Sequence, residues 1–386
     1  MERMKLVDKC LMIPFLILSL FSIVMVYSAS SYTALRLHDN PAYYMNRQFV
    51  FVAIGLIAAF AGFLMPFRLL KSKKIILSAV IFMLLMLSVL LIFGREVYGA
   101  KRWLEIGSFN LQPAELAKLV TIWYFSYILS RKQHLITERF IHSIVAPCVL
   151  VGLLIVLIFI QPDTGSSLII LAIGSVMILA SGVSVYLGIT FGVFGLLLLT
   201  SVLGLIRTFG DQLFFLKDYQ YKRFLAFWKP FELADGPGLQ LVHSYYALSR
   251  GGIWGVGIGK SIQKTGYLPF AHTDFIVSII GEEFGLIGIL CLLSLFLMLV
   301  TSVYLIGIRT NDCFDALLCI GIGTMLLIQS MINLGGVVGL MPISGMTFPF
   351  ISYGGSSMII LSFSIGLVAN VSARSNKQRK LSRKER

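Results

Sequence analysis

Residues 266–285 read GYLPFAHTDFIVSIIGEEFG, a polar, proline-bearing loop that enters a long apolar segment. The apolar segment continues to about residue 306, and about 20 such residues suffice to cross a bilayer as a helix. Asp274 stands at the junction, where the expected helix meets water. A carboxylate there stays charged while it lies within reach of a lipid-borne ligand, so we treat Asp274 as the candidate chemical centre.

The composition is that of a membrane protein. Hydrophobic residues make up 57% of the 386 positions, charged residues make up 13%, and the mean hydropathy is +0.88. The apolar runs are long and unbroken, whereas membrane barrels give weak alternating segments of about ten residues. We therefore expect an all-α polytopic membrane protein with ten transmembrane helices and a large extracytoplasmic loop between the seventh and the eighth. The expected spans are residues 11–29, 48–65, 75–93, 113–130, 143–160, 166–182, 184–206, 275–306, 313–334 and 350–371.

Basic residues gather on one side of these spans. The two termini and the loops near 66–74, 130–142 and 307–315 hold 18 of the 32 Lys and Arg residues but only six of the 18 Asp and Glu residues. Because cytoplasmic loops are enriched in Lys and Arg, both termini are predicted to be cytoplasmic. On the opposite, outer side, the two long loops are then residues 94–112 and 207–275.

The chain divides into a membrane domain, residues 1–372, and a basic cytoplasmic tail, residues 373–386. The membrane domain includes the outer loop at about 207–275. We interpret the tail as a topology determinant that touches anionic lipid, so the net charge of +14 gives no reason to expect nucleic acid. The five cysteines lie in apolar runs or on the cytoplasmic side, and no disulfide framework is expected.

Ionisable residues within membrane spans are costly, so each one is a candidate for function. Glu115 and Lys118 lie three residues apart on a helix that Pro113 opens, and they share one face. A structural ion pair and direct substrate contact both remain open for them. Asp163, next to Pro162 after the fifth span, is a candidate for the site or for a turn or helix cap.

Arg102 and Arg223 lie in the two outer loops, where guanidinium groups suit phosphate. Arginines near a membrane also anchor to lipid headgroups, and this alternative remains open. His272, Thr273 and Asp274 precede the eighth span, where capping of the helix is the simpler alternative. The loop before them interleaves basic and aromatic residues, which suits a surface that holds an anionic, apolar ligand.

Two carboxylates follow Asp274 in the same predicted helix. Glu282 lies about 80° around the helix from Asp274, and Glu283 lies about 180° away. Glu282 is therefore the better candidate for a second carboxylate, and we interpret both as more structural than chemical. Further on, residues 333–357 read NLGGVVGLMPISGMTFPFISYGGSS, and irregular backbone at membrane depth must line a cavity or be buried in protein. This predicts a re-entrant or broken segment beside the site.

Four segments resemble the SEDS family, the shape, elongation, division and sporulation proteins. They are GAKRWLEIGSFNLQPAELAKL (99–119), YQYKRFLAFWKPFE (219–232), GIGKSIQKTGYLPFAHTDFIVSIIGEE (257–283) and residues 333–357. The similarity runs in order from about residue 10 to 371. It implies ten spans and a peptidoglycan glycosyltransferase that polymerises lipid II outside the bacterial cytoplasmic membrane. The stretch GSFNLQPAELAKL resembles division members more than elongation members, which implies a role in septal wall synthesis.

The resemblance also implies site residues. It makes Asp274 the catalytic residue. Phe270 departs from the family pattern, since many relatives carry an acidic residue there, and this departure weakens the expectation of a metal site. The candidate substrate-binding residues are Arg102, Glu115, Lys118, Asp163, Arg223, His272, Thr273, Ser352, Gly354 and Gly355.

The implied reaction needs one base. Pyrophosphate leaves as a stable anion, so no general acid is required, unlike in glycosidases. We expect Asp274 to act as the base while Arg102, Arg223, Lys118 or a divalent cation, Mg²⁺ or Mn²⁺, stabilises the developing charge. No organic cofactor is expected.

The resemblance implies lipid II, a class B penicillin-binding protein (a transpeptidase), other division proteins and membrane lipids as partners. A lipid II flippase or other transporter is an alternative, because ten spans and buried charges permit it as well. An elongation-type polymerase and a non-catalytic division scaffold are further alternatives.

Overall fold

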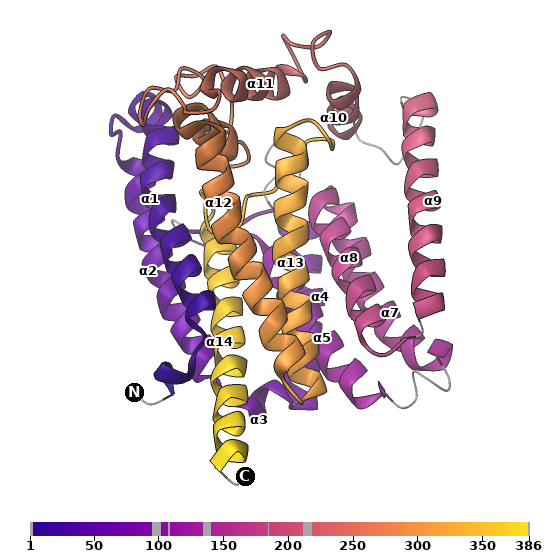
Figure 1. Cartoon of the computed structure of the whole chain (residues 1–386). Coiled ribbons are helices and arrows are strands. Elements are labelled where there is room, and N and C mark those ends of the chain that lie inside the picture. Colours follow the sequence, from indigo (N-terminus) through magenta and orange to yellow (C-terminus); the bar gives the residue numbers. More distant parts are fainter. Residues whose placement is uncertain are drawn as a thin grey trace.

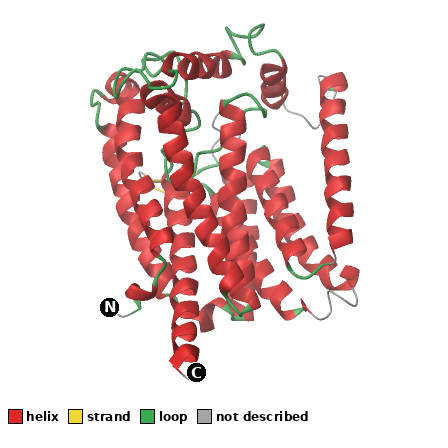
Figure 2. Cartoon of the chain, viewed as in Figure 1, coloured by secondary structure: helices red, strands yellow, loops and turns green. Residues whose placement is uncertain are grey.

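The computed structural model describes residues 3–94, 102–106, 109–133, 140–183, 185–210 and 218–384. Helices dominate these residues and run side by side as a bundle (Figure 1, Figure 2). The short elements are η1 (Met4–Leu6), α3 (Phe67–Leu70), the antiparallel strands β1 (Leu104–Ile106) and β2 (Phe109–Leu111), α10 (Asp218–Trp228) and α11 (Leu239–Gly251). The long helices are α1 (Lys9–His38), α2 (Tyr43–Leu64), α4 (Lys73–Phe93), α5 (Pro113–Arg131), α7 (Phe140–Ile160), α8 (Thr164–Ala180), α9 (Val185–Phe209), α12 (Ile276–Arg309), α13 (Cys313–Val337) and α14 (Gly355–Lys384).

The long helices lie where the sequence predicts membrane spans, and the all-α membrane fold is confirmed. Among the described residues, eight helices are long and apolar enough to cross a membrane. The other two expected spans correspond to α8, a shorter apolar helix, and to α5, whose 19 residues include Glu115 and Lys118. The exact count of ten spans stays a prediction.

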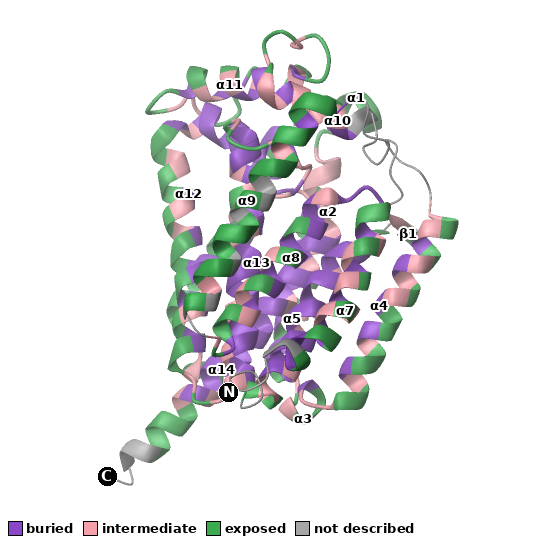
Figure 3. Ribbon diagram, turned by 90° about the vertical axis from the view of Figure 1, so that its right-hand side faces the viewer, coloured by how far each residue is buried: buried purple, intermediate pink, exposed green. Residues whose placement is uncertain are grey.

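Helices α13 and α14 form the centre of the bundle. In their most apolar stretches 67% and 89% of the residues are buried, against 7% in α9, which stands at the edge (Figure 1). Figure 3 shows the same gradient, with buried residues concentrated inside and exposed ones on the outer helices. Helix α2 packs closely on α14, since a Cβ on Gly62 would lie 2.7 Å from the carbonyl oxygen of Phe363. Small residues allow such approach between membrane helices.

The two ends of the bundle differ. Both termini lie at one end, and α11 lies across the other end (Figure 1). The loop predicted to be the large outer one, residues 207–275, therefore lies opposite the termini; its residues 211–217 fall outside the described part of the chain.

Helix α12 is broken at Gly285, where φ is 68°. The freed backbone pairs with the outer loop: Val256 N donates to the Glu282 carbonyl oxygen at 3.0 Å, and Gly257 N donates to that of Glu283 at 2.9 Å. An L side chain at Gly285 would be strained at this φ, so glycine permits the break. The break holds the outer loop against the first turns of α12.

The side chains of Glu282 and Glu283 hold the same loop. Glu282 accepts a hydrogen bond from Arg250 Nη1 at 2.7 Å. Glu283 accepts from Lys264 Nζ and from Ser28 Oγ, each at 2.6 Å. Both carboxylates are buried and paired, which agrees with their structural interpretation.

Residues 338–354 connect α13 to α14 without a helix. Several of their side chains are buried, among them Ile343, Met346 and Phe348. The broken segment predicted within residues 333–357 is confirmed, although its first residues still belong to α13 and its last three begin α14.

Candidate active site

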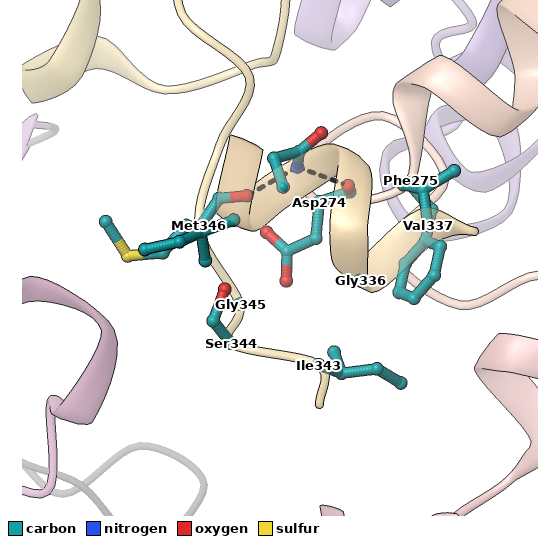
Figure 4. Close-up of a pocket in the computed structure, with 10 residues that line it drawn as sticks. Asp274, Phe275, Gly336, Val337, Ile343, Ser344, Gly345 and Met346 are labelled. Atoms are coloured by element: carbon teal, nitrogen blue, oxygen red, sulfur yellow. Dashed lines mark hydrogen bonds between the residues drawn. The ribbon is translucent and has the colours of Figure 1, made fainter. Parts of the chain in front are cut away.

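Asp274 lies two residues before α12 and faces a small cavity. The cavity holds about 10 Å³, about the room of one water, and is lined by the end of α13 and by residues 343–346. Asn333 Nδ2 donates to the Asp274 carbonyl oxygen at 2.8 Å and to that of Met346 at 2.6 Å, which ties the two segments together (Figure 4). The N-cap position of α12 is Phe275, without a side-chain cap, so capping does not explain Asp274.

The charges around Asp274 favour ionisation near neutral pH. Burial raises the pKa of Asp274 to about 6, and the positive charges of Arg223 and Arg102 and a hydrogen bond with Thr273 oppose this rise. A carboxyl with this pKa is suited to general-base catalysis at pH 7, because it is mostly ionised and still accepts a proton.

Arg223 and Asp274 meet at Gly345. A Cβ on Gly345 would lie 3.4 Å from Arg223 Nη1 and 3.5 Å from Asp274 Oδ2. Arg223 Nη1 also donates to the Ile343 carbonyl oxygen at 3.1 Å, which fixes it on the same connection. The bare backbone of Gly345, with φ of 75°, leaves space between a cation and a base.

Asp163 is both a helix cap and a link to the outer hairpin. It is buried and accepts from Ser166 N at 3.2 Å, and thereby caps α8. It also accepts from Gln112 Nε2 at 3.0 Å, just after β2. The neighbouring Pro162 carbonyl oxygen accepts from the guanidinium of Arg102. The cap interpretation of Asp163 is confirmed, and it positions the segment that carries Arg102.

Glu115 and Lys118 form a buried ion pair. Lys118 Nζ lies 2.7 Å from Glu115 Oε1 and donates to Gln329 Oε1, also at 2.7 Å. Gln329 Nε2 in turn donates to the Thr347 carbonyl oxygen at 3.1 Å. The ion-pair interpretation is confirmed, and the chain of contacts runs from α5 through α13 to the connection that carries Gly345.

His272 lies in an aromatic cluster. Its ring centroid lies 4.6 Å from that of Tyr44 in α2 and 5.7 Å from that of Tyr353. Burial lowers the pKa of His272 to about 4, so the ring is neutral at pH 7. Tyr353 N donates to the His272 carbonyl oxygen at 3.0 Å, which brings the turn before α14 next to the residues that precede α12.

The remaining candidates make local contacts. Thr273 Oγ1 donates to the Phe270 carbonyl oxygen at 3.2 Å, and Ser352 Oγ accepts from Phe348 N at 2.8 Å within its own turn. Gly354 and Gly355 form the entry to α14. The structure thus brings Asp274 and Arg223 together at Gly345, and Arg102 acts on Asp274 through its charge. Ser352 stabilises a turn.

Gln329 and Thr347 were not predicted from the sequence. Gln329 joins Lys118 to Thr347, while Asn333, predicted only as the start of the irregular run, holds Asp274. The amide side chains of Gln329 and Asn333 stand four residues apart on one face of α13, in the mostly apolar second half of the helix. That spacing of costly polar groups was the available signal.

The described residues do not form a protein-held metal site. No group of three or more His, Cys, Asp or Glu side chains gathers among them in a way that could hold an ion. The described residues that act on Asp274 through their charge are Arg223 and Arg102, and cations do not serve as ligands. These described residues do not fit a Mg²⁺ or Mn²⁺ ion held by the protein. The divalent cation expected from the sequence has not been tested and stays a prediction.

The sequence matches known proteins over nearly its full length. The FtsW/RodA/SpoVE family model, described as "Cell cycle protein", matches residues 8–377. The chain is 38% identical over 373 residues to the probable peptidoglycan glycosyltransferase FtsW of Bacillus subtilis, covering 96% of this chain and 92% of that protein. It is 35% identical over 369 residues to the protein of the same description in Trichlorobacter lovleyi, covering 95% and 93%.

Two solved structures share the fold. The first belongs to work described as "Structural coordination of polymerization and crosslinking by a peptidoglycan synthase complex"; it has a TM-score of 0.76 and 27% identity, and covers 96% of this chain and 98% of that chain. The second is the rod shape determining protein RodA of Thermus thermophilus, with a TM-score of 0.67, 25% identity and coverage of 95% and 96%. The family resemblance stated from the motifs is confirmed: this multi-pass membrane protein belongs to the FtsW/RodA/SpoVE family of cell cycle proteins.

Proposed function

We propose that the protein is a peptidoglycan glycosyltransferase that polymerises lipid II into glycan strands during septal wall synthesis. The observation that carries this proposal is the convergence of a carboxylate and a guanidinium on Gly345, with Asp274 at a pKa of about 6. The names of the relatives support the activity, and FtsW relatives in particular support the septal role.

The reaction follows from the groups present. A sugar hydroxyl of one lipid II attacks the anomeric carbon of a glycan carried on undecaprenyl pyrophosphate. The new C–O bond forms as the bond to the pyrophosphate oxygen breaks, and the hydroxyl proton passes to Asp274. Attack opposite the leaving group inverts the anomeric centre, so an α-linked donor gives a β-linked product.

The cations have a separate task in this proposal. Pyrophosphate gains negative charge as the bond breaks, and Arg223 and Arg102 already act electrostatically on Asp274. Guanidinium groups suit phosphate oxygens and stabilise charge that develops in the transition state. Lys118 pairs with Glu115 and donates a hydrogen bond to Gln329. We therefore propose that Lys118 does not contact the pyrophosphate but stabilises, through Gln329, the connection between α13 and α14. Of the other candidates, we assign His272 and Thr273 to positioning Asp274, Asp163 to positioning Arg102, and Ser352, Gly354 and Gly355 to the turn that adjoins the substrate.

We propose that the active site faces the outside of the cytoplasmic membrane and that both termini are cytoplasmic. The support is the concentration of Lys and Arg near the termini and their adjoining loops, and the position of the site at the opposite end of the bundle. A class B penicillin-binding protein and other division proteins are the proposed partners. The similarity to a chain from a peptidoglycan synthase complex supports the first of these.

Purified protein supplied with lipid II alone tests the enzymatic proposal. We expect glycan strands that a muramidase digests. The transporter alternative is tested with the same protein in liposomes, where the movement of fluorescent lipid II between the two leaflets is measured. Movement without polymer would contradict the proposal. An elongation role is distinguished by locating the protein in cells, because a septal enzyme gathers at midcell and an elongation enzyme lies along the side wall.

A further inference from the structure

Residues near both termini line a cavity of about 310 Å³. The two termini lie at the same end of the bundle (Figure 1). The walls of the cavity come from the segment before α1 and from the last turns of α14. This volume lies within the range of small-molecule sites, roughly 300–1,000 Å³. The lining residues are Lys5, Leu6, Val7, Asn376, Arg379 and Lys380.

Contacts between distant parts of the chain build the cavity. Asn376 Nδ2 donates to the Leu6 carbonyl oxygen at 2.8 Å, and Asp8 N donates to Ser372 Oγ at 3.1 Å. These two bonds fasten the N-terminal segment along α14. The cavity therefore depends on both termini and is not a property of the basic tail alone.

The charge of the cavity is positive. Six of the described residues line it, and of these three are cations and none is acidic. The closest acid in the described N-terminal segment, Asp8, accepts from Cys10 N at 2.9 Å and caps α1. The guanidinium of Arg379 is held by the carbonyl oxygen of Arg309 at the end of α12, at 2.8 Å. An anion with several acceptor oxygens fits this arrangement, and phosphate is the anion that Arg and Lys bind most generally.

We propose that this cavity binds the phosphate group of an anionic phospholipid from the membrane leaflet at the terminus end. Lys5, Arg379 and Lys380 supply the cations, and Leu6 and Val7 supply an apolar wall for the glycerol backbone. A free phosphate shares the chemistry of the headgroup, but two observations favour lipid. The N-terminal wall of the cavity is the segment directly before the apolar helix α1. Part of that wall is apolar. The proposal is independent of the glycosyltransferase activity.

Native mass spectrometry of the full-length protein in detergent tests the site. The probes are dioleoylphosphatidylglycerol and dioleoylphosphatidylcholine, and the test variant is Lys5→Gln with Lys380→Gln. The matched control is Lys9→Gln with Lys377→Gln. It removes the same charge from the start of α1 and from α14, at residues that are exposed like Lys5 and Lys380 but do not line the cavity. Equal melting temperatures of the two variants establish that both are folded.

We expect the phosphatidylglycerol affinity of the test variant to fall by about 25-fold, at about fivefold for each of the two cations, and that of the control to change less than twofold. Equal losses in both variants would mean diffuse attraction to the tail and would overturn the site. Equal binding of phosphatidylcholine would overturn its anion selectivity. Displacement of phosphatidylglycerol by millimolar inorganic phosphate, or by a decamer of glutamate, would overturn lipid as the occupant.

Discussion

The side chains of Arg223 and Asp274, which come from different elements of the fold, both lie next to Gly345. Arg223 belongs to α10 in the outer loop, and Asp274 precedes α12, while Gly345 lies on the connection between α13 and α14. A group at the Cβ position of Gly345 would be in van der Waals contact with both side chains. We infer that reacting atoms occupy this space.

Gly345→Ala is expected to reduce polymerisation by about 10²-fold. The methyl group would occupy the space that we assign to the reacting atoms of the substrate, and a misplacement of about 1 Å has that effect. The substitution also places an L residue at φ of 75°, which costs roughly 1–2 kcal/mol of stability. Initial rates on lipid II and a thermal melt separate the two effects. Gly152→Ala is the control, because Gly152 in α7 has open space around its Cβ position. A Gly345→Ala enzyme that is less stable but fully active would show that the space is not used.

The rate should rise with pH through about 6, since the pKa of Asp274 is raised to about 6 and the ionised form is the base. Arg223 lowers this pKa, so Arg223→Gln should move the rise to higher pH as well as reduce the rate. Arg223→Lys keeps the charge and should keep the position of the rise. The pH profile of kcat/KM for the three proteins measures this. A profile that does not move in Arg223→Gln would show that Arg223 does not act on the base.

Lys118→Ala should destabilise the protein by about 3–5 kcal/mol, because it leaves the Glu115 carboxylate buried without its cation. The double variant Glu115→Gln with Lys118→Met removes both charges and should recover most of the loss. Thermal unfolding in detergent reports both effects. If the double variant is no more stable than Lys118→Ala, the ion pair is not what the single substitution disturbs.

The sequence predicted those parts of the structure that depend on local pattern. Long apolar runs indicated the helices, and the spacing of Glu115 and Lys118 indicated their ion pair. A proline and a short polar run indicated the cap at Asp163.

Contacts between distant segments were beyond sequence reasoning. The bond from Lys118 to Gln329 and the bond from Gln329 to Thr347 exist because the connection between α13 and α14 returns into the bundle. The contact of His272 with Tyr44 requires α2 to lie beside the loop before α12. The periodicity of apolar residues along the sequence does not predict these contacts, because they depend on how the whole bundle packs.

The most direct test compares lipid II polymerisation by Asp274→Asn with that by Asp235→Asn. Asp235 is an exposed aspartate in the same outer loop, so both variants lose one carboxylate at almost unchanged volume. With both proteins folded, we expect Asp274→Asn to be slower than wild type by about 10²- to 10⁴-fold, the usual contribution of a general base, and Asp235→Asn to match wild type. Polymerisation by Asp274→Asn at the wild-type rate would contradict the assignment of Asp274 as the base.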